Sequence, residues 1–513
     1  MSKLNKGLLI TTAVLTASLI LTGCSTPSQS SASSNQTATA SATDFFTTDT
    51  IHEISVDFDE ADYQTMLTEY TNSGDKTWIK ATVTIDGTTF KNVGIKLKGN
   101  STLRGLSNSA TKTESKTTNK TESTEATTTS TAEEKNVPTG EPSSLDSESP
   151  ETLPWVIRLD KYEKDVAYKG RSYFVVRANN TETSLNEAVA LAVLNEAGVE
   201  AEKAAFTKFS VNNSEEKLRL VLDVPDDDLW TEEHFDSTGL LYKADGNGDY
   251  SYRGTDPTDY VDVFEQKYGD DDLTPLISFL DFINNSTDED FAAELDDYLD
   301  TDAFATYLAS QELIHNTDDI DGPGNNSYLY YDATTKKMTV VAWDHNLAFG
   351  GMGMGGFAGG KMAGALGKND GMTPADAGQT PPEGMENPPE GMGTPPEMDG
   401  SRPEMPDGEQ FQGDDNEKTD RPAGGMGGMG GKENILVTRF LANDTFKDLY
   451  QTKLDSLTTS VIDNDFGASV LSDYQELLTK NVSDLVDSET IVSEAKSISD
   501  MLQSEPLLTS ESK

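Results

Sequence analysis

Two long segments of this chain contain too few apolar residues to build a core, so they determine which parts of it can fold. Residues 105–152 are mostly Ser, Thr, Glu and Lys, and residues 350–432 are rich in Gly, Met and Pro, with the sequence PPEGM occurring twice. Ordering a backbone costs about 1 to 2 kcal/mol per residue, which such segments cannot offset by burial. We expect two disordered insertions, the second of them a flexible spacer. Copper(I) binding by its methionine thioethers is the alternative.

The start of the chain has the pattern of an export signal that ends in a lipid attachment site. Two lysines precede an apolar run over residues 7–21, which is short for a membrane span. The run ends in Leu-Thr-Gly-Cys, which resembles a bacterial lipobox and implies attachment of lipid to the thiol of Cys24, the only cysteine. We expect a lipoprotein signal peptide over 1–23, a disordered tether over 24–43 and a lipid-anchored location on the extracytoplasmic face of a bacterial membrane. A cytosolic protein with an apolar N-terminal helix is the alternative.

Apolar periodicity predicts an α+β fold, with a region of antiparallel sheet followed by a largely helical C-terminal region. Strands are predicted over residues 51–56, 78–85, 90–97, 155–159, 204–211 and 218–224. Helices are predicted over residues 59–70, 184–197, 260–268, 273–284, 288–299, 302–315, 434–441, 445–457, 468–480 and 490–502. We expect one domain over 44–349, which the helices of 433–513 complete.

A predicted hairpin near the middle of the chain carries the side chains that point to chemistry. Strands 328–331 and 338–342 are apolar or alternate, and the turn between them is polar. The hairpin brings the loop with Asp321 and Asn326 close to Asp344, which follows the second strand. Opposed carboxylate and amide oxygens suit Mg²⁺ or Mn²⁺, which commonly carry nucleotide phosphates. The alternative is that Asp321 and Asn326 form an Asx-rich turn and that Asp344 caps a helix or turn.

Basic residues lie on both sides of the first insertion. If that insertion occupies a loop, the strands before and after it become neighbours in one sheet. Lys98, Arg104 and Arg158 are then available to hold phosphates, although each is also explained as a solvated residue at a strand. Glu187, in the first turn of a predicted helix, could pair with such a base, but we expect it to be exposed and favoured by the helix dipole.

The charge of the chain excludes one class of partner. Its formal net charge is −50 and its isoelectric point is about 4.2. Such a chain repels the phosphates of nucleic acid, so we expect no nucleic acid partner. The acidity favours a basic protein partner, or simply solubility at a cell surface. Residues 243–256 partly fit a calcium-binding loop, but they lack the glycine at the sixth place and the final Glu, so we expect an Asx-rich loop there.

Several blocks of the sequence, in order, resemble the CotH family of atypical protein kinases. Asp321 is followed by Asn326 and then by a hairpin that ends in Trp343 and Asp344, as in the catalytic half of that family. Further blocks match in the same order: GIKLKGNS at 94–101 with Arg104, PWVIRLDK at 154–161, NEAGV at 195–199 and LYKADG at 241–246. The resemblance extends over residues 50–350 and the C-terminal helices, interrupted by the two insertions.

The resemblance implies an atypical protein-kinase-like fold and transfer of a phosphoryl group from ATP to Ser or Thr of a protein substrate. It implies that Asp321 is the catalytic carboxylate, that Asn326 and Asp344 hold Mg²⁺ or Mn²⁺, and that the three basic residues hold the nucleotide. A non-catalytic, surface-anchored interaction protein with the same fold is the alternative. The presence of both acids and the amide favours the enzyme.

Overall fold

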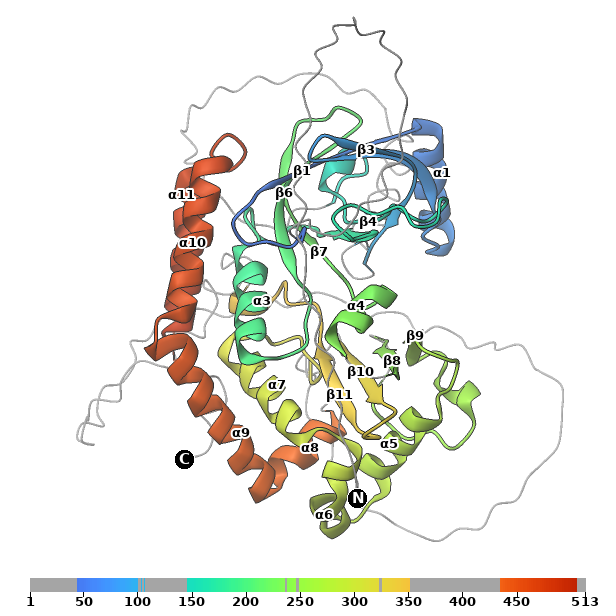
Figure 1. Cartoon of the computed structure of the whole chain (residues 1–513), viewed down its shortest axis with the longest axis vertical. Helices are drawn as coiled ribbons and strands as arrows, with labels where there is room; N and C mark the ends of the chain where they lie inside the picture. The colour runs from blue at the N-terminus through green and yellow to red at the C-terminus, as the bar shows by residue number, and fades with distance from the viewer. Residues whose placement is uncertain are drawn as a thin grey trace, which may run out of the picture.

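The structure is a computed structural model that describes residues 44–99, 103, 106, 145–235, 238–245, 249–322, 325–350 and 434–504. The predicted signal peptide, Cys24, the predicted tether and nearly all of the two predicted insertions lie outside the described residues. The described residues form both sheets and helices, which confirms the predicted α+β class. Figure 1 shows a barrel at one end of the molecule and a second sheet, with most of the helices, at the other.

The N-terminal region forms a closed barrel. In spatial order its strands are β1 (His52–Phe58), β2 (Ile79–Ile85), β3 (Thr88–Leu97), β4 (Trp155–Arg158), β5 (Tyr173–Val176), β7 (Lys217–Leu222) and β6 (Ala204–Val211). Neighbouring strands are antiparallel except β1 and β6, which pair in parallel with Ile54 opposite Phe209. The prediction of an antiparallel sheet is therefore wrong for one pair of strands, β1 and β6. The parallel pair of β1 and β6 closes the barrel, because these two strands, which are far apart in the chain, meet at that position.

Alternating burial explains why these segments form the barrel. The buried residues of β2 are Ile79, Ala81, Val83 and Ile85, and the residues between them point outward. Helix α1 (Glu60–Ser73) packs on the same core through Tyr63 and Met66. The helix begins at the side-chain cap of Asp59 and ends at Gly74, whose φ of +79° suits glycine.

The ends of the first insertion also pack into the barrel. Leu97 of β3 pairs with Trp155 of β4, as predicted for the strands on either side of the insertion. Leu106 and Leu145, however, are 5% and 8% exposed and belong to the barrel core. The folded domain therefore includes residues at both ends of the segment predicted as an insertion over 105–152, because isolated leucines in a polar segment can still fill a core.

The second sheet has the strand order β11, β10, β8, β9, and it contains the predicted central hairpin. Its strands are β8 (Gly239–Ala244), β9 (Phe264–Tyr268), β10 (Ser327–Asp332) and β11 (Met338–Ala342). The prediction of a helix over residues 260–268 was wrong. A short 3-10 helix, Pro257–Tyr260, precedes β9, and β9 pairs with β8. Pairing with a neighbouring strand overrode the local helical pattern.

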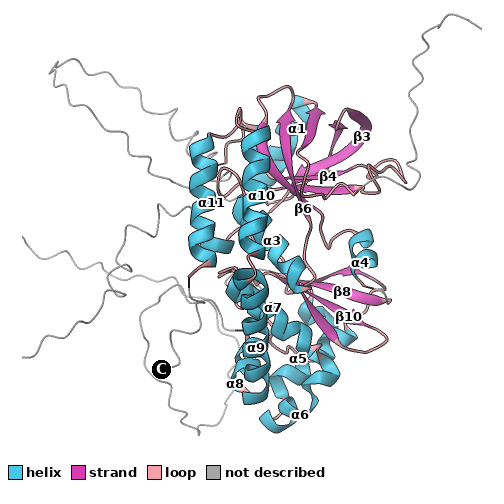
Figure 2. Ribbon diagram, turned by 60° about the vertical axis from the view of Figure 1, so that its left-hand side comes forward, coloured by secondary structure: helices cyan, strands magenta, loops and turns pink. Residues whose placement is uncertain are grey.

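Helices cover the second sheet and extend to the barrel. They are α3 (Leu185–Ala197), α4 (Asp228–His234), α5 (Thr274–Asn285), α6 (Asp288–Tyr298), α7 (Thr301–Leu313), α8 (Ile435–Ala442), α9 (Asp444–Leu457), α10 (Phe466–Asn481) and α11 (Ser488–Leu502). Figure 2 shows α10 and α11 side by side, alongside α3 and the barrel. Among the described helices, none is both long and apolar enough to cross a membrane.

An apolar cluster joins the barrel to the second sheet. Val156 and Val175 of the barrel pack with Leu241 and Tyr328 of the second sheet, and with Trp343 just after β11, in one buried group. Burial of this group stabilises the contact between the two parts by the hydrophobic effect. The packing places the end of β5 next to the end of the central hairpin.

Candidate functional site

The hairpin of β10 and β11 brings two predicted metal ligands to the same end of one sheet. Ser327 pairs with Ala342, so Asn326 and Asp344 lie just beyond the last pair of the ladder. The predicted hairpin is thus confirmed. Asp344 has a φ of +64°, a left-handed conformation that is uncommon for a residue other than glycine and is often found at functional sites.

Asp321 lies in the loop between α7 and β10 and contacts the start of α8. Its Oδ1 accepts a hydrogen bond from the backbone N–H of Asn434 at 2.5 Å, and its own N–H donates to Asp319 at 3.0 Å. The side-chain amide of Asn326 donates to the carbonyl of Asp318 at 2.8 Å, so its Oδ1 points away from that contact. Burial, with the nearby charge of Asp321, raises the pKa of Asp319 to about 6.

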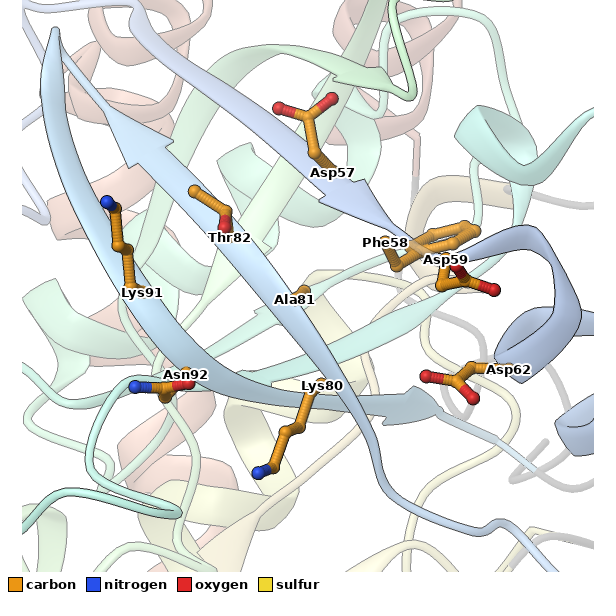
Figure 3. A pocket seen from close by; sticks show the side chains of 9 residues that line it. All are labelled: Asp57, Phe58, Asp59, Asp62, Lys80, Ala81, Thr82, Lys91 and Asn92. Atoms are coloured by element: carbon orange, nitrogen blue, oxygen red, sulfur yellow. The ribbon is translucent and has the colours of Figure 1, made fainter.

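Two pockets differ in their relation to these residues. A pocket of about 240 Å³ includes Asp321 and Asp319 in its wall, together with residues of α7, α8 and α9. A pocket of about 440 Å³ lies on the outside of the barrel (Figure 3). The residues that line it are Asp57, Phe58, Asp59, Asp62, Lys80, Ala81, Thr82, Lys91 and Asn92. None of them is a predicted site residue, so the larger pocket lies outside the candidate site.

Arg177, which the sequence analysis did not select, contacts Asp344. It directly follows β5, and it forms ion pairs with Asp344 and with Glu187 of α3, the latter at 3.0 Å. Glu187 is only 2% exposed, so the expectation of an exposed first-turn residue was wrong. The reason is that nearly every residue of the first two turns of α3 is buried between the barrel and the other helices.

Burial and the charge of Arg177 shift the pKa values of Glu187 and Asp344. Burial raises the pKa of Glu187 to about 7, although Arg177 opposes the shift. Burial alone would also raise the pKa of Asp344, but the Arg177 guanidinium holds it below its usual range. The two carboxylates therefore share one guanidinium, and Asp344 is the one that stays ionised at neutral pH.

Lys98, a predicted nucleotide-binding residue, belongs to a lysine cluster around Asp226. The ammonium groups of Lys98 and Lys267 lie 3.6 and 3.8 Å from the Asp226 carboxylate. Lys98 and Lys243 lie over the ring of Trp343 at 5.1 and 4.8 Å. Within the described residues Lys243 forms no ion pair, and burial together with Lys98 lowers its pKa to about 8. The end of the hairpin is therefore bordered by an excess of positive charge.

The sequence matches the model of a known protein family. Residues 144–502, most of the chain, match the family model described as CotH kinase protein. The chain belongs to the CotH family. It matches no curated protein. The part that matches the CotH model contains Arg177, Glu187 and the central hairpin, whereas Lys98 precedes it.

The other two basic residues predicted to bind the nucleotide in this CotH family member are Arg158 and Arg104. Arg158, at the end of β4, forms an ion pair with Asp160 at 2.9 Å and lies over the ring of Tyr173 at 5.4 Å. The hydrogen bond to Asp160 raises the pKa of Arg158. Its side chain is 37% exposed, so it could still contact a ligand. Arg104 lies outside the described residues.

The oxygen atoms at the end of the central hairpin are of the kind that bind a metal ion together with nucleotide phosphates. Within the described ranges, no group of three or more His, Cys, Asp or Glu residues could hold a metal ion by itself. Mg²⁺, however, usually binds one or two carboxylates and completes its shell with water and phosphate oxygens. The carboxylate of Asp344 and the amide oxygen of Asn326 fit that requirement.

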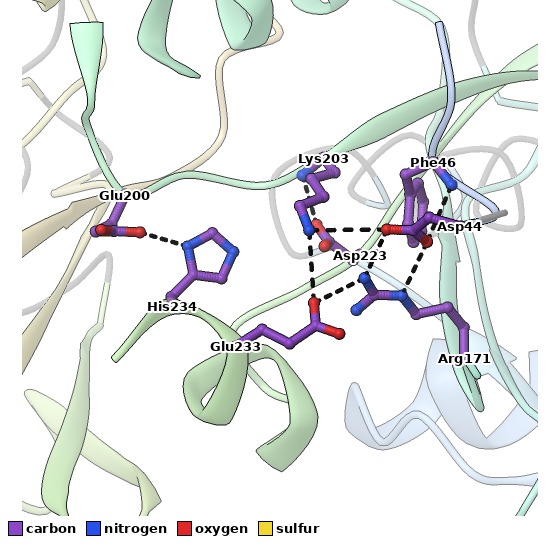
Figure 4. A network of polar contacts seen from close by, with 8 residues as sticks. All are labelled: Asp44, Phe46, Arg171, Glu200, Lys203, Asp223, Glu233 and His234. Carbon is purple, nitrogen blue, oxygen red and sulfur yellow. Dashed lines mark hydrogen bonds and ion pairs between the residues drawn. The ribbon is translucent and has the colours of Figure 1, made fainter. Parts of the chain in front are cut away.

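A separate polar network tethers the first described residue to the fold (Figure 4). Arg171 forms ion pairs with Asp44 at 2.9 Å and with Glu233 at 2.7 Å. Beside them, the buried carboxylate of Asp223 accepts a hydrogen bond from the backbone N–H of Lys203 at 2.5 Å. Burial raises the pKa of Asp223 to about 8. This network supports the barrel and lies outside the candidate site.

Only a weak signal could have identified Arg177 from the sequence, whereas Lys243 already lies in the block LYKADG that resembles the CotH family. Each is the basic residue at the end of a short apolar run, YFVV before Arg177 and LLY before Lys243. A base that ends a buried strand lies at the edge of a sheet, where sites often form. Runs this short occur by chance, however, so the contacts of both residues became evident only in the folded chain.

Proposed function

We propose that this CotH family member is a protein kinase that transfers the γ-phosphoryl group of ATP to a Ser or Thr hydroxyl of a protein, with Mg²⁺ or Mn²⁺. The observation that carries the proposal is the ion-pair chain from the buried Glu187 through Arg177 to the part-buried Asp344, next to the lysine cluster. Protein kinases use a related device, in which a base on a strand pairs with a helix glutamate and contacts the nucleotide phosphates.

The basic residues would bind the nucleotide phosphates. Lys98 and Lys243 border the end of the hairpin and lie over aromatic rings, and among the described residues Asp226 is the acid that pairs with Lys98, so a polyphosphate would add negative charge to this cluster. Arg177 is engaged by two carboxylates and would act mainly by orienting Asp344. This division assigns direct phosphate contact to the lysines, with Arg158 and Arg104 as further candidates at the edge.

The metal would be held by Asp344 and Asn326, and when bound it neutralises charge on the transferring phosphates. Asp321 would accept the proton of the substrate hydroxyl or orient that hydroxyl for attack. Its loop is fixed by the hydrogen bond to Asn434, and this reduces the reorganisation that the reaction requires.

The protein would act outside the cytoplasm, anchored by lipid on Cys24. The Leu-Thr-Gly-Cys sequence supports this location. A substrate at the same surface would be a protein with Ser or Thr residues, and a basic one would be attracted by the net charge of −50.

A transfer assay tests the proposal. Full-length protein in detergent would be incubated with γ-labelled ATP and Mg²⁺ or Mn²⁺, alone and with a basic, Ser-rich protein. We expect labelled phosphoserine or phosphothreonine that disappears when the metal is chelated. Nucleotide binding without any transfer to protein would favour the alternative, a surface-anchored interaction protein with the same fold.

A further inference from the structure

A chain of buried polar side chains connects the two segments that carry the predicted metal ligands. It runs from Glu202, which lies between α3 and β6, through His345 and Gln311 to Asn316. These four residues are 3%, 1%, 2% and 7% exposed. Buried polar groups are costly unless they are paired, so their alignment in the core requires an explanation. We call these four residues the polar relay.

The contacts of the relay have one consistent direction. The amide nitrogen of Asn316 donates to Oε1 of Gln311 at 2.8 Å, and Nε2 of Gln311 lies 3.3 Å from Nε2 of His345. The amide nitrogen of Gln311 can only donate, so Nε2 of His345 must accept. The proton of the His345 ring therefore lies on Nδ1. Nδ1 faces a carboxylate oxygen of Glu202 at 3.7 Å. The two hydrogen bonds therefore both point toward His345, an arrangement in which successive bonds polarise one another, and Nδ1 of His345 faces Glu202 without forming a hydrogen bond within the described residues.

Two members of the relay, His345 and Asn316, connect it to the candidate site. His345 is the residue after Asp344, so fixing its ring fixes the backbone beyond the left-handed turn at Asp344. At the other end, Oδ1 of Asn316 accepts from the N–H of Asp318 at 3.3 Å, and the carbonyl of Asp318 accepts from the amide of Asn326 at 2.8 Å. The contacts thus form a continuous path from Asp344 to Asn326 through the core.

Glu202 has no evident structural role other than its contact with His345. Within the described residues neither of its carboxylate oxygens has a hydrogen bond, and the polar group that faces them is Nδ1 of His345, at 3.7 Å. An unpaired buried carboxylate costs stability, and an apolar residue would fill the same place without that cost. A residue that destabilises the fold but orients a neighbouring side chain is typical of the shell around a metal site.

We propose that Gln311 and His345 are positioning residues that set the separation of Asp344 and Asn326, with Glu202 fixing the tautomer of His345. The inference rests on the proposed function, because it assigns the relay to the metal site of that function. The relay residues themselves contact neither metal nor substrate.

Metal binding measured without transfer tests the proposal. Mn²⁺ would be titrated into full-length protein in detergent with a non-hydrolysable ATP analogue, and free Mn²⁺ would be followed by electron paramagnetic resonance. We expect Gln311→Leu and His345→Leu to weaken Mn²⁺ binding by about 10- to 100-fold, the range seen when groups behind metal ligands are removed. Affinity for the analogue without metal should stay at the wild-type value. His345→Gln keeps an acceptor and a donor and should restore part of the Mn²⁺ affinity.

Two further variants keep the test decisive. Glu202→Gln changes only the charge at the end of the relay and should weaken Mn²⁺ binding in the same direction, even if the leucine variants fail to fold. Asn284→Leu removes two amide contacts of α5 that lie outside the relay and serves as the control for a purely structural loss. It should lower thermal stability and leave Mn²⁺ binding unchanged.

The outcomes separate this inference from the proposed function. Wild-type protein that binds no Mn²⁺ with the analogue would overturn both. Wild-type protein that binds Mn²⁺, with equal affinity in Gln311→Leu and Glu202→Gln, would overturn the relay alone. Loss of Mn²⁺ affinity in these variants, with partial recovery in His345→Gln, would support it.

Discussion

Arg177 and Asp344 form an ion pair that joins the end of β5 in the barrel to the end of β11 in the second sheet. The side chain of Arg177 is 12% exposed, and Glu187 completes the group from α3. Segments that are far apart in the chain therefore meet at one guanidinium. Charges buried in this way stabilise a fold only when they are all paired, so the group should be sensitive to the loss of any member.

Replacement of Arg177 tests how much the fold depends on this group. Arg177→Met would leave the buried Glu187 and the part-buried Asp344 without their partner, and we expect the free energy of unfolding to fall by about 3 to 5 kcal/mol. Urea denaturation would measure it. Arg158→Met is the control, since the pair of Arg158 with Asp160 is partly exposed and should contribute no more than about 1 kcal/mol. Equal losses in the two variants would contradict the role given to Arg177.

Replacement of Asp344 tests the metal assignment. Asp344→Asn keeps the shape of the side chain but removes the charge that attracts Mg²⁺. We expect both metal-dependent nucleotide binding and phosphoryl transfer to be lost. Calorimetry with ATP and Mg²⁺ would measure binding, and circular dichroism would show that the variant is folded. Wild-type nucleotide affinity in the folded variant would rule out Asp344 as the metal ligand.

Replacement of Asp321 should have a different signature. In Asp321→Asn the metal ligands Asn326 and Asp344 remain, so ATP and Mg²⁺ should bind as in the wild type. Transfer should fall by about 10²- to 10⁴-fold, because the substrate hydroxyl loses its proton acceptor. The same calorimetry and a transfer assay would separate the two effects. Full transfer activity in this variant would show that Asp321 is not the catalytic carboxylate.

The stability of the barrel should depend on pH through Asp223. Its pKa is about 8 in the folded chain and near its ordinary value of about 3.9 in the unfolded chain. Between these values the folded state binds more protons, so the contribution of Asp223 lowers the free energy of unfolding as pH rises from about 4 to 8. Asp223→Asn cannot ionise and can still accept the hydrogen bond from Lys203.

Denaturation of wild-type protein and Asp223→Asn at pH 5 and pH 8 would test this. We expect the variant to gain stability relative to the wild type at pH 8 and to differ much less at pH 5. Asp256→Asn, a change at an exposed carboxylate, serves as the control. A constant difference between wild type and Asp223→Asn at both pH values would show that Asp223 does not carry the effect.

The predicted lipid anchor can be tested without reference to activity. Cys24→Ala removes the only thiol of the chain, so no lipid can be attached there. We expect the variant to lose labelling by a radioactive fatty acid and to leave the membrane fraction of expressing cells. A variant that still fractionates with membranes, with no labelled band lost, would contradict the prediction.

The sequence by itself determined the features that depend on neighbouring residues. The hairpin of β10 and β11 followed from apolar runs around a polar turn, and the strands predicted over 78–85 and 90–97 form the paired β2 and β3. These features are local, because side-chain alternation and turn chemistry act over a few residues. The pairing that brings Asn326 and Asp344 to one end of a sheet was therefore predictable.

Only the tertiary structure decided which distant segments meet. The parallel contact of β1 with β6 closes the barrel, and β9 became a strand because β8 offered it a partner. Burial of the first turn of α3 turned Glu187 from an expected surface residue into the partner of Arg177. The physical reason is that such contacts depend on the packing of whole elements, about which the few residues around each position carry almost no information.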